Sequence, residues 1–387
     1  MKPRLQSVDI LRGLIMVIMA LDHTRDFFNV TAMSFQPEDL AHTTTAIFFT
    51  RWITHFCAPV FMFTAGIGAS LRLDRRGNRA ELSRFLWTRG LWLLLLELTL
   101  VRLTFFFDFT YNPTFLLVFW SIGISMIVLA GLIYLPFNAI LAISVGMVLL
   151  HNVIDRFTPA ELGLAPWLFN ILHRPGVVIA DPTVIVGYPL IPWIGVIGVG
   201  FCFGRLYRLP DGQRGRVMIW MGLIMTAAFI ALRYSNLYGD PSPWSPQTQD
   251  GFTLLSFLRA TKNPPSLVFL LMTLGPAIAF LGVVDRVQWK VTHPLIVFGR
   301  TPLFYFIAHL AVIHVFAIAL TAAHYGWHPW VVTPPPTIGG TGYPDGYGWS
   351  LPFTYFMWVL VVAALYPVCR WLADYKATHR AWWVSYL

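Results

Sequence analysis

The stretch DILRGLIMVIMALDHTRD, residues 9–26, places ionisable side chains at both ends of what otherwise reads as a membrane-spanning helix. Every residue between Gly13 and Asp22 is apolar. At 100° per residue, Arg12 and His23 fall almost in line on one face of that helix, roughly 16 Å apart along its axis. Because ionisable groups within a membrane span are costly, they usually serve function. The stretch therefore predicts a functional site on the first helix, with a cation near one membrane surface and an imidazole toward the other.

A purely structural interpretation of the same residues stays open. Asp9 and Arg12 can pair at the start of the helix, and a His at its far end can anchor it in the interface. The crowding of ionisable side chains where the span ends favours a functional site instead. These side chains are Asp22, His23, Arg25 and Asp26.

The composition of the whole chain is typical of an integral membrane protein. Of its 387 residues, 57% are hydrophobic and 12% are charged, and the mean hydropathy is +0.64, which is far too apolar for a soluble domain. The three cysteines lie in apolar runs without metal or disulfide spacing, so we expect them to be buried fillers. No repeat or linker divides the chain, which predicts a single integral domain over residues 1–387.

The apolar runs predict an all-α fold, a polytopic transmembrane bundle of about ten spans. The predicted spans cover residues 8–28, 47–71, 85–107, 115–135, 139–154, 186–203, 217–232, 266–284, 295–321 and 352–371. The ninth contains Gly299, Arg300 and Pro302, so we expect a short segment followed by a helix from Thr301.

Lys and Arg are unevenly shared between the two sides of these spans. With the N-terminus inside, the inner segments carry Lys2, Arg4, Arg72, Arg75, Arg76, Arg79, Arg84, Arg205, Arg208, Arg214, Arg216, Arg286, Lys290, Lys376 and Arg380, and the outer loops carry Arg156, Arg174, Arg233, Arg259 and Lys262. The positive-inside rule then predicts that both termini are cytoplasmic, in the inner (plasma) membrane of the cell. The long outer loop 322–351 is rich in Pro, Tyr and Trp, which suits a lid or a sugar-binding rim, although a loose loop explains it equally well.

Several short motifs, taken in order, resemble the membrane acyltransferase superfamily. They begin with Arg4-x-x-x-Val8-Asp9-x-Leu11-Arg12-Gly13 followed by His23, and continue with PVFMFTAG (59–66), RFLWTRG (84–90), YPLIPWIG (188–195), KNPPSL (262–267), FGRTPL (298–303) and WWVSYL (382–387). Taken in this order, the motifs resemble those of the bacterial branch related to the heparan-alpha-glucosaminide N-acetyltransferase catalytic domain. The sequence of the first helix also resembles that of the glycan O-acyltransferases. The similarity covers nearly the whole chain and is specific for the superfamily, not for a substrate.

The resemblance implies that an acyl group, usually acetyl, moves from a cytoplasmic acyl-CoA to a hydroxyl or amine on the far side of the membrane. The expected donor is acetyl-CoA or another acyl-CoA, and the expected partners are the lipid bilayer and a saccharide or amino-sugar acceptor, without nucleic acid or metal. The resemblance leaves open whether the protein forms a homodimer. Guanidinium forks bind phosphate oxygens, so the candidates for holding CoA are Arg12, Arg84, Arg89 and Arg300. Ordinary positive-inside anchoring explains Arg84 and Arg89 better.

Attack on a thioester needs a base, and an imidazole works near neutral pH. His23 is the first candidate, and Asp26, three residues on, is preferred over Asp22 as its partner because it lies on the neighbouring helical face. In the heparan acetyltransferase branch, the position matching Asp22 is an amide and the catalytic His lies further on, where this chain has Met33. We therefore expect the catalytic His at the end of the first helix, as in the glycan acyltransferases.

Two further histidines are candidate catalytic residues. His55 lies one turn after Arg51, and His309 one turn after Tyr305; each is also explained as a polar contact within the bundle. His42, in a Thr-rich loop, is expected to be solvated. The candidates for contacts with the acceptor are Arg25, Lys262 and Trp193.

Two other classes of function are compatible with parts of the sequence. A transporter or flippase of a small polar or lipid-linked substrate also suits ionisable span residues and proline-broken helices, but it often has two related halves, and none is detected. A non-catalytic scaffold gives no reason for placing Arg12 and His23 in line. The sequence therefore favours an acyl-CoA-dependent acyltransferase. No paired spacing of His with carboxylates indicates a zinc site.

Overall fold

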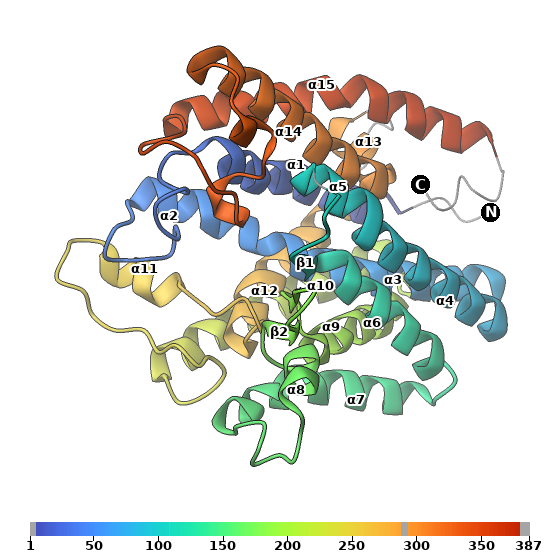
Figure 1. The fold of residues 1–387 in the computed structure, drawn as a ribbon. Coiled ribbons are helices and arrows are strands. Elements are labelled where there is room, and N and C mark those ends of the chain that lie inside the picture. Colours follow the sequence, from blue (N-terminus) through green and yellow to red (C-terminus); the bar gives the residue numbers. More distant parts are fainter. Residues whose placement is uncertain (1–4, 108, 288–292, 380–387) are drawn as a thin grey trace.

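The computed structural model describes residues 5–107, 109–287 and 293–379. These residues are mostly helical (Figure 1). The elements are α1 (Gln6–Phe28), α2 (Thr45–Trp52), η1 (Ile53–Phe56), α3 (Cys57–Arg76), α4 (Arg79–Leu96), η2 (Glu97–Val101), α5 (Arg102–Phe106), β1 (Thr114–Leu116), α6 (Val118–Leu132), α7 (Phe137–Leu150), η3 (His151–Arg156), α8 (Pro166–Leu172), β2 (Gly176–Ile179), β3 (Val184–Val186), α9 (Leu190–Phe203), η4 (Gly204–Arg208), α10 (Asp211–Ser235), α11 (Phe252–Leu258), α12 (Leu267–Val284), α13 (Pro294–Arg300), α14 (Pro302–Tyr325), η5 (Pro329–Val332), η6 (Pro336–Ile338) and α15 (Leu351–Thr378). The predicted motif at 382–387 and the cations Lys2, Arg4, Lys290 and Arg380 lie outside the described residues.

Each of the ten predicted spans contains helix. Within the described residues, seven helical runs are long and apolar enough to cross a membrane: Thr45–Arg76, Phe137–Arg156, Leu190–Arg208, Asp211–Ser235, Leu267–Val284, Pro302–Tyr325 and Leu351–Thr378. The protein is therefore a multi-pass membrane protein. Whether α1, α4 and the shorter α6 complete ten crossings stays a prediction.

The ninth predicted span is interrupted, as its Gly-Arg-Thr-Pro sequence indicated. α13 ends at Arg300 and α14 starts at Pro302, one residue later than expected. Proline suits the first position of a helix because it has no N–H to satisfy there.

A small sheet departs from the all-α prediction. β1 pairs in parallel with β3, and β2 pairs with β3 in antiparallel fashion. The predicted spans 115–135 and 186–203 therefore begin in strands, and their helices start only at Val118 and Leu190. Short apolar runs do not distinguish a strand from a helix by periodicity alone, which is why the sequence missed the sheet.

Glycines bring α1 against α13 at backbone distance. A Cβ atom on Gly13 would lie 1.8 Å from a carbonyl oxygen of α13, and one on Gly299 would lie 1.8 Å from a carbonyl oxygen of α1. α3 and α9 meet in the same way through Gly66 and Gly200. Small residues at helix crossings are typical of membrane bundles, where close backbone packing replaces the hydrophobic driving force.

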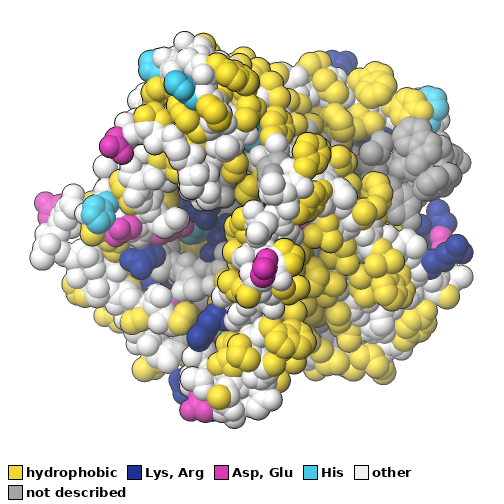
Figure 2. Space-filling model, viewed as in Figure 1, with side chains coloured by type: hydrophobic (Ala, Val, Ile, Leu, Met, Phe, Trp, Pro, Cys, Tyr) yellow, Lys and Arg dark blue, Asp and Glu magenta, His cyan; other side chains and the backbone are white. Residues whose placement is uncertain are grey.

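The bundle has two distinct ends. At the N-terminal end, where α1 starts, the Lys376 ammonium donates to the Arg300 carbonyl oxygen (3.2 Å), and Arg300 pairs with Asp9 (3.7 Å), so α1 begins beside the end of α15. At the loop end, where α1 stops at Phe28, lie α2 and α11 (Figure 1). Figure 2 shows charged side chains gathered around a hollow at that end, beside a largely hydrophobic surface.

Candidate active site

The carboxylate of Asp22 is the centre of an ionic cluster at the end of α1. It accepts two hydrogen bonds from Nη1 of Arg51, at 2.7 and 2.6 Å, and pairs with Nη1 of Arg25 at 2.9 Å. The Thr54 hydroxyl donates a further hydrogen bond at 3.0 Å. Paired charges and hydrogen bonds make a carboxylate tolerable in such a position. Asp22 is thus an anchor that joins α1 to α2 and η1.

Glu38 extends this cluster from the loop between α1 and α2. Its Oε1 accepts from Nε of Arg51 at 3.0 Å and lies 3.0 Å from Nε2 of His55. Burial raises the pKa of Glu38, but the Arg51 charge and the hydrogen bond from His55 outweigh it and hold the pKa of the carboxyl below its ordinary value. His55, a predicted candidate base, is therefore occupied by Glu38 and is only 2% exposed.

His23 is not hydrogen-bonded to the carboxylate predicted as its partner. Its Nδ1 lies 3.9 Å from Oδ2 of Asp26, too far for a hydrogen bond. The other oxygen of Asp26 accepts from Arg25 at 2.6 Å. The imidazole is instead enclosed by rings, with centroid distances of 5.3 Å to Phe105 and 6.4 Å to Phe306.

His309 comes from α14 to lie beside His23, with 5.3 Å between the ring centroids. It is completely buried. Its Nδ1 lies 2.9 Å from the Tyr305 carbonyl oxygen, which can only accept, so Nδ1 carries the hydrogen and neutral His309 presents Nε2 as an acceptor. Nε2 has no hydrogen-bond partner among the described residues. The structure thus brings two of the three predicted histidines together.

A cavity of about 80 Å³ opens beside these residues. Its wall consists of Met19, Asp22, His23, Thr54, Cys57, Ala58, Phe61, Glu97, Val101, Phe105, Leu117, Val118, Tyr188, Lys262 and Phe306. The wall thus combines one imidazole, two carboxylates and one ammonium with apolar side chains, as ligand-binding cavities often do. Within residues 5–107, 109–287 and 293–379, no three His, Cys, Asp or Glu side chains are arranged to hold a metal ion.

Glu97 lines the cavity but is not among the site residues predicted from the sequence. It is 3% exposed and begins the π-helical turn η2. Its two carboxylate oxygens accept from the backbone N–H groups of Leu117 and Phe119, each at 2.9 Å, at the start of α6. A lone acid in the apolar run LWLLLLELTLV (91–101) was the available signal, because charges inside spans are rare.

Of the three residues predicted to contact the acceptor, one lines the cavity and two lie behind its wall. Lys262 lines the cavity. Arg25 is 4% exposed and is committed to Asp22 and Asp26. Trp193 is completely buried behind the wall, where it stacks on Tyr188 at 5.8 Å between centroids.

The predicted CoA-binding cations lie toward the N-terminal end, on α1, α4 and α13. Arg12 donates from Nη2 to the Thr64 carbonyl oxygen at 2.5 Å and does not line the cavity. Arg84 is exposed and Arg89 is partly buried on α4. Arg300 lies beside Asp9. The cavity wall on α1 stops at Met19, about 10 Å along the axis from Arg12.

The aromatic loop predicted as a lid is folded onto the loop end of the bundle. Trp330, Tyr343, Tyr347 and Trp349 form a chain of ring contacts with successive centroid distances of 4.9, 4.5 and 5.7 Å. The hydroxyl of Thr337 donates to the Asp26 carbonyl oxygen at 2.8 Å. The loop is therefore tied to α1 one turn beyond His23.

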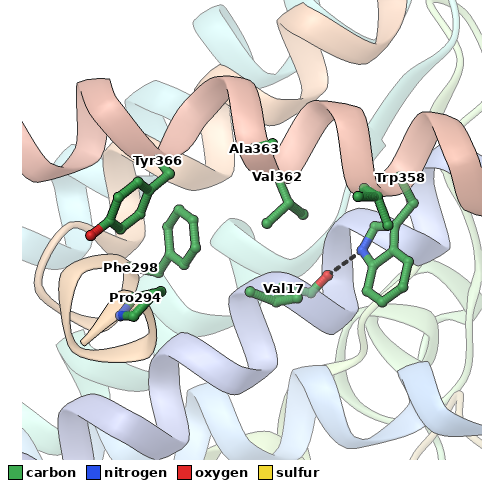
Figure 3. Close-up of a pocket in the computed structure, with 8 residues that line it drawn as sticks. Val17, Pro294, Phe298, Trp358, Val362, Ala363 and Tyr366 are labelled. Carbon is green, nitrogen blue, oxygen red and sulfur yellow. Dashed lines mark hydrogen bonds between the residues drawn. The ribbon is translucent and has the colours of Figure 1, made fainter.

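A second pocket, of about 360 Å³, lies between α1, α13 and α15 (Figure 3). It is lined by Val17, Pro294, Phe298, Trp358, Val359, Val362, Ala363 and Tyr366. The Trp358 indole donates to the Val17 carbonyl oxygen at 2.8 Å. Among the residues that the structure describes, this wall holds no carboxylate, imidazole or cationic side chain, so the pocket lacks the usual groups for acid–base chemistry.

Comparison with known families gives a match over more than half of the chain. The sequence model described as "Heparan-alpha-glucosaminide N-acetyltransferase, catalytic" matches residues 4–236. No curated protein matches the chain. The matched part contains His23, the Asp22 cluster and Glu97, whereas Lys262 and His309 lie beyond it.

Proposed function

Because the chain belongs to the heparan-alpha-glucosaminide N-acetyltransferase catalytic family, we propose that it is an acyl-CoA-dependent acyltransferase embedded in the inner (plasma) membrane. The acyl group, acetyl in the first instance, passes to a hydroxyl or amine of a glycan or amino sugar. The observation that carries this proposal is the cavity at the loop end, where His23 shares the wall with Asp22, Glu97 and Lys262 and is backed by the buried ring of His309.

The two ends of the bundle receive the two substrates. The positive-inside rule assigns the arginine-rich N-terminal end to the cytoplasm, which is the source of acyl-CoA. Arg12 and Arg300, with Arg84 and Arg89 on α4, are the proposed contacts for the CoA phosphates. The acceptor reaches the cavity from the loop end, past the aromatic loop.

The donor must reach His23 through a route that opens on binding. Arg12 lies outside the cavity wall, and two turns of α1 separate it from Met19. The narrow pantetheine arm of CoA therefore has to part α1 from α3 along this distance. Substrate-driven opening and closing of this kind is common among enzymes.

In the proposed reaction, His23 removes the proton from the acceptor as its oxygen or nitrogen attacks the thioester carbonyl carbon. Collapse of the tetrahedral intermediate breaks the carbon–sulfur bond, and the imidazolium of His23 returns the proton to the CoA thiolate. His309 packs against His23 and fixes the position of its ring. Asp22, held by Arg51 and Arg25, and nearby Asp26 supply negative charge that favours the imidazolium.

Release of free CoA from acetyl-CoA by the purified protein tests the proposal, with amino sugars and glycans as acceptors. His23→Ala is expected to lose the activity by about 100- to 10,000-fold, the usual contribution of a general base, while it still binds acetyl-CoA. His379→Ala, which removes an exposed histidine at the other end of the bundle, is the matched control and keeps the wild-type rate.

Two results contradict the proposal. Equal rates for wild type and His23→Ala remove His23 from the mechanism. Binding of donor or acceptor without turnover under any condition favours a transporter or flippase instead.

A further inference from the structure

Lys262 lines the same cavity as His23, and its ammonium makes no hydrogen bond or ion pair with any described residue. Two carboxylates, Asp22 and Glu97, line that cavity as well. Asp22 is already satisfied by two arginines, and Glu97 by backbone N–H groups. An ammonium that has no hydrogen-bond acceptor in a partly enclosed cavity is stabilised when a ligand offers it an oxygen atom.

The other cations near His23 are not available for a ligand. Arg25 is bound to Asp22 at 2.9 Å and to Asp26 at 2.6 Å. Arg51 is bound to Asp22 at 2.6 Å and to Glu38 at 3.0 Å. Lys262 is therefore the uncommitted cation on the described part of the cavity wall.

The backbone on both sides of Lys262 is held firmly. Asp240 accepts from the N–H of Thr261 and from its hydroxyl, each at 2.9 Å, and from the Ser266 hydroxyl at 2.9 Å. The Ser266 N–H also donates to the Thr261 carbonyl oxygen at 3.0 Å. This one carboxylate pins the turn before and after Lys262, so the lysine enters the cavity from a preorganised base. Preorganised charge is what stabilises a transition state, because no reorganisation is needed during reaction.

We infer that Lys262 is a catalytic residue that binds the thioester carbonyl oxygen and stabilises the negative charge that develops on it. The inference rests on the proposed acyl transfer. When the acceptor attacks, a bond forms to the carbonyl carbon, the acceptor proton moves to His23, and the carbonyl electron pair moves onto the oxygen beside Lys262. When that pair reforms the carbonyl, the carbon–sulfur bond breaks, and the CoA thiolate takes the proton from His23.

This role differs from the contact with an anionic acceptor that the sequence suggested for Lys262. A lysine that binds only the acceptor contributes equally to ground state and transition state, so its loss raises the acceptor KM and leaves kcat unchanged. A lysine that holds the oxyanion contributes mainly in the transition state, so its loss lowers kcat. The two roles are therefore separable by kinetics.

The test compares Lys262→Met with Lys262→Arg and with Arg259→Met in acetyl-CoA turnover. Arg259→Met removes an exposed cation from the same loop and is expected to behave as wild type. Lys262→Met is expected to lower kcat by about 100- to 1,000-fold, the usual effect of removing one oxyanion donor, with unchanged acetyl-CoA affinity and melting temperature. Lys262→Arg retains the charge and is expected to keep part of the rate.

A second measurement does not depend on turnover. The carbonyl stretch of bound acetyl-CoA, labelled with carbon-13 at the carbonyl, is recorded by infrared spectroscopy in wild type and in Lys262→Met. Contact with an ammonium polarises the carbonyl, so the band in wild type is expected at lower frequency than in the variant.

The outcomes separate this inference from the proposed function. If wild type turns over but Lys262→Met has the same kcat, raises only the acceptor KM, or shows the same carbonyl band, the inference is overturned and the acyltransferase stands. If wild type binds acetyl-CoA but releases no CoA, the proposed function fails, and an unshifted carbonyl band overturns the inference as well. A wild type that binds no acyl-CoA overturns both.

Discussion

The imidazole rings of His23 and His309 lie 5.3 Å apart, centroid to centroid, although the residues come from the first helix and from α14. His309 is anchored through Nδ1 to a backbone carbonyl of its own helix and stacks on the ring of Tyr305 (5.3 Å, 10°). The position of the proposed base is therefore set from a second helix.

His309→Gln is expected to lower kcat by up to about 100-fold, because a small displacement of a reacting group has effects of that size. Acetyl-CoA affinity is expected to stay at the wild-type value. His314→Gln is the matched control, since His314 lies on the same helix and bonds the Thr104 carbonyl oxygen (3.0 Å), and its ring contacts Phe27 and Phe107 rather than His23. A wild-type kcat together with an unchanged acidic limb of the pH–rate profile in His309→Gln would contradict this positioning role.

Glu38→Gln is expected to lower the melting temperature by a constant amount between about pH 5 and pH 8. Although burial opposes it, the charge of Arg51 and the hydrogen bond from His55 lower the pKa of Glu38 in the folded state. Its stabilising effect is therefore fully present above the ordinary carboxyl pKa of about 4.3 and is lost as the pH falls below that value toward the folded pKa. The difference from wild type should accordingly shrink below about pH 4.

The control for this prediction is Glu161→Gln. Glu161 lies in an exposed loop and bonds only Thr158 among the described residues, so its replacement should change the melting temperature little at any pH. If the difference in melting temperature between Glu38→Gln and wild type grew on acidification, it would contradict the proposed ion pair.

Glu97→Ala is expected to loosen the start of α6. The substitution leaves the N–H groups of half-buried Leu117 and buried Phe119 without acceptors, at a cost of about 1–3 kcal/mol for the buried group. Hydrogen exchange should accelerate in the first turn of α6 and leave α12 unchanged. Glu81→Gln, at the start of α4, serves as the control; unchanged exchange in Glu97→Ala would show that other groups hold this turn.

Gly13→Ala is expected to destabilise the bundle by about 3 kcal/mol, at the upper end of the cost of overpacking. Its Cβ atom would lie 1.8 Å from the backbone oxygen of Leu295, so α1 and α13 would have to separate. Gly146→Ala, where a Cβ meets no atom within 4 Å, should be neutral or slightly stabilising. Thermal unfolding in one detergent compares the two, and equal melting temperatures would contradict the packing argument.

The sequence predicted the helices and the break at Pro302 because long apolar runs and a proline are local signals. It also selected His23 and His309, since ionisable residues stand out in apolar surroundings. Arg51 as the main partner of Asp22 was not foreseen, because that pairing joins helices separated by a loop. Glu38 could not be predicted from the sequence, because an acidic residue in a polar loop is usually solvated. Its contact with Arg51 forms only in the folded protein.

The wall that faces His23 is assembled from distant parts of the polypeptide, with Lys262 and Phe306 contributed well after residue 236, where the family match ends. During biosynthesis the ribosome delivers His23 to the membrane first and these other groups much later. A nascent chain can therefore hold no complete cavity until α14 has been inserted. Truncation of the chain before α14 should therefore leave His23 in the membrane without the cavity beside it.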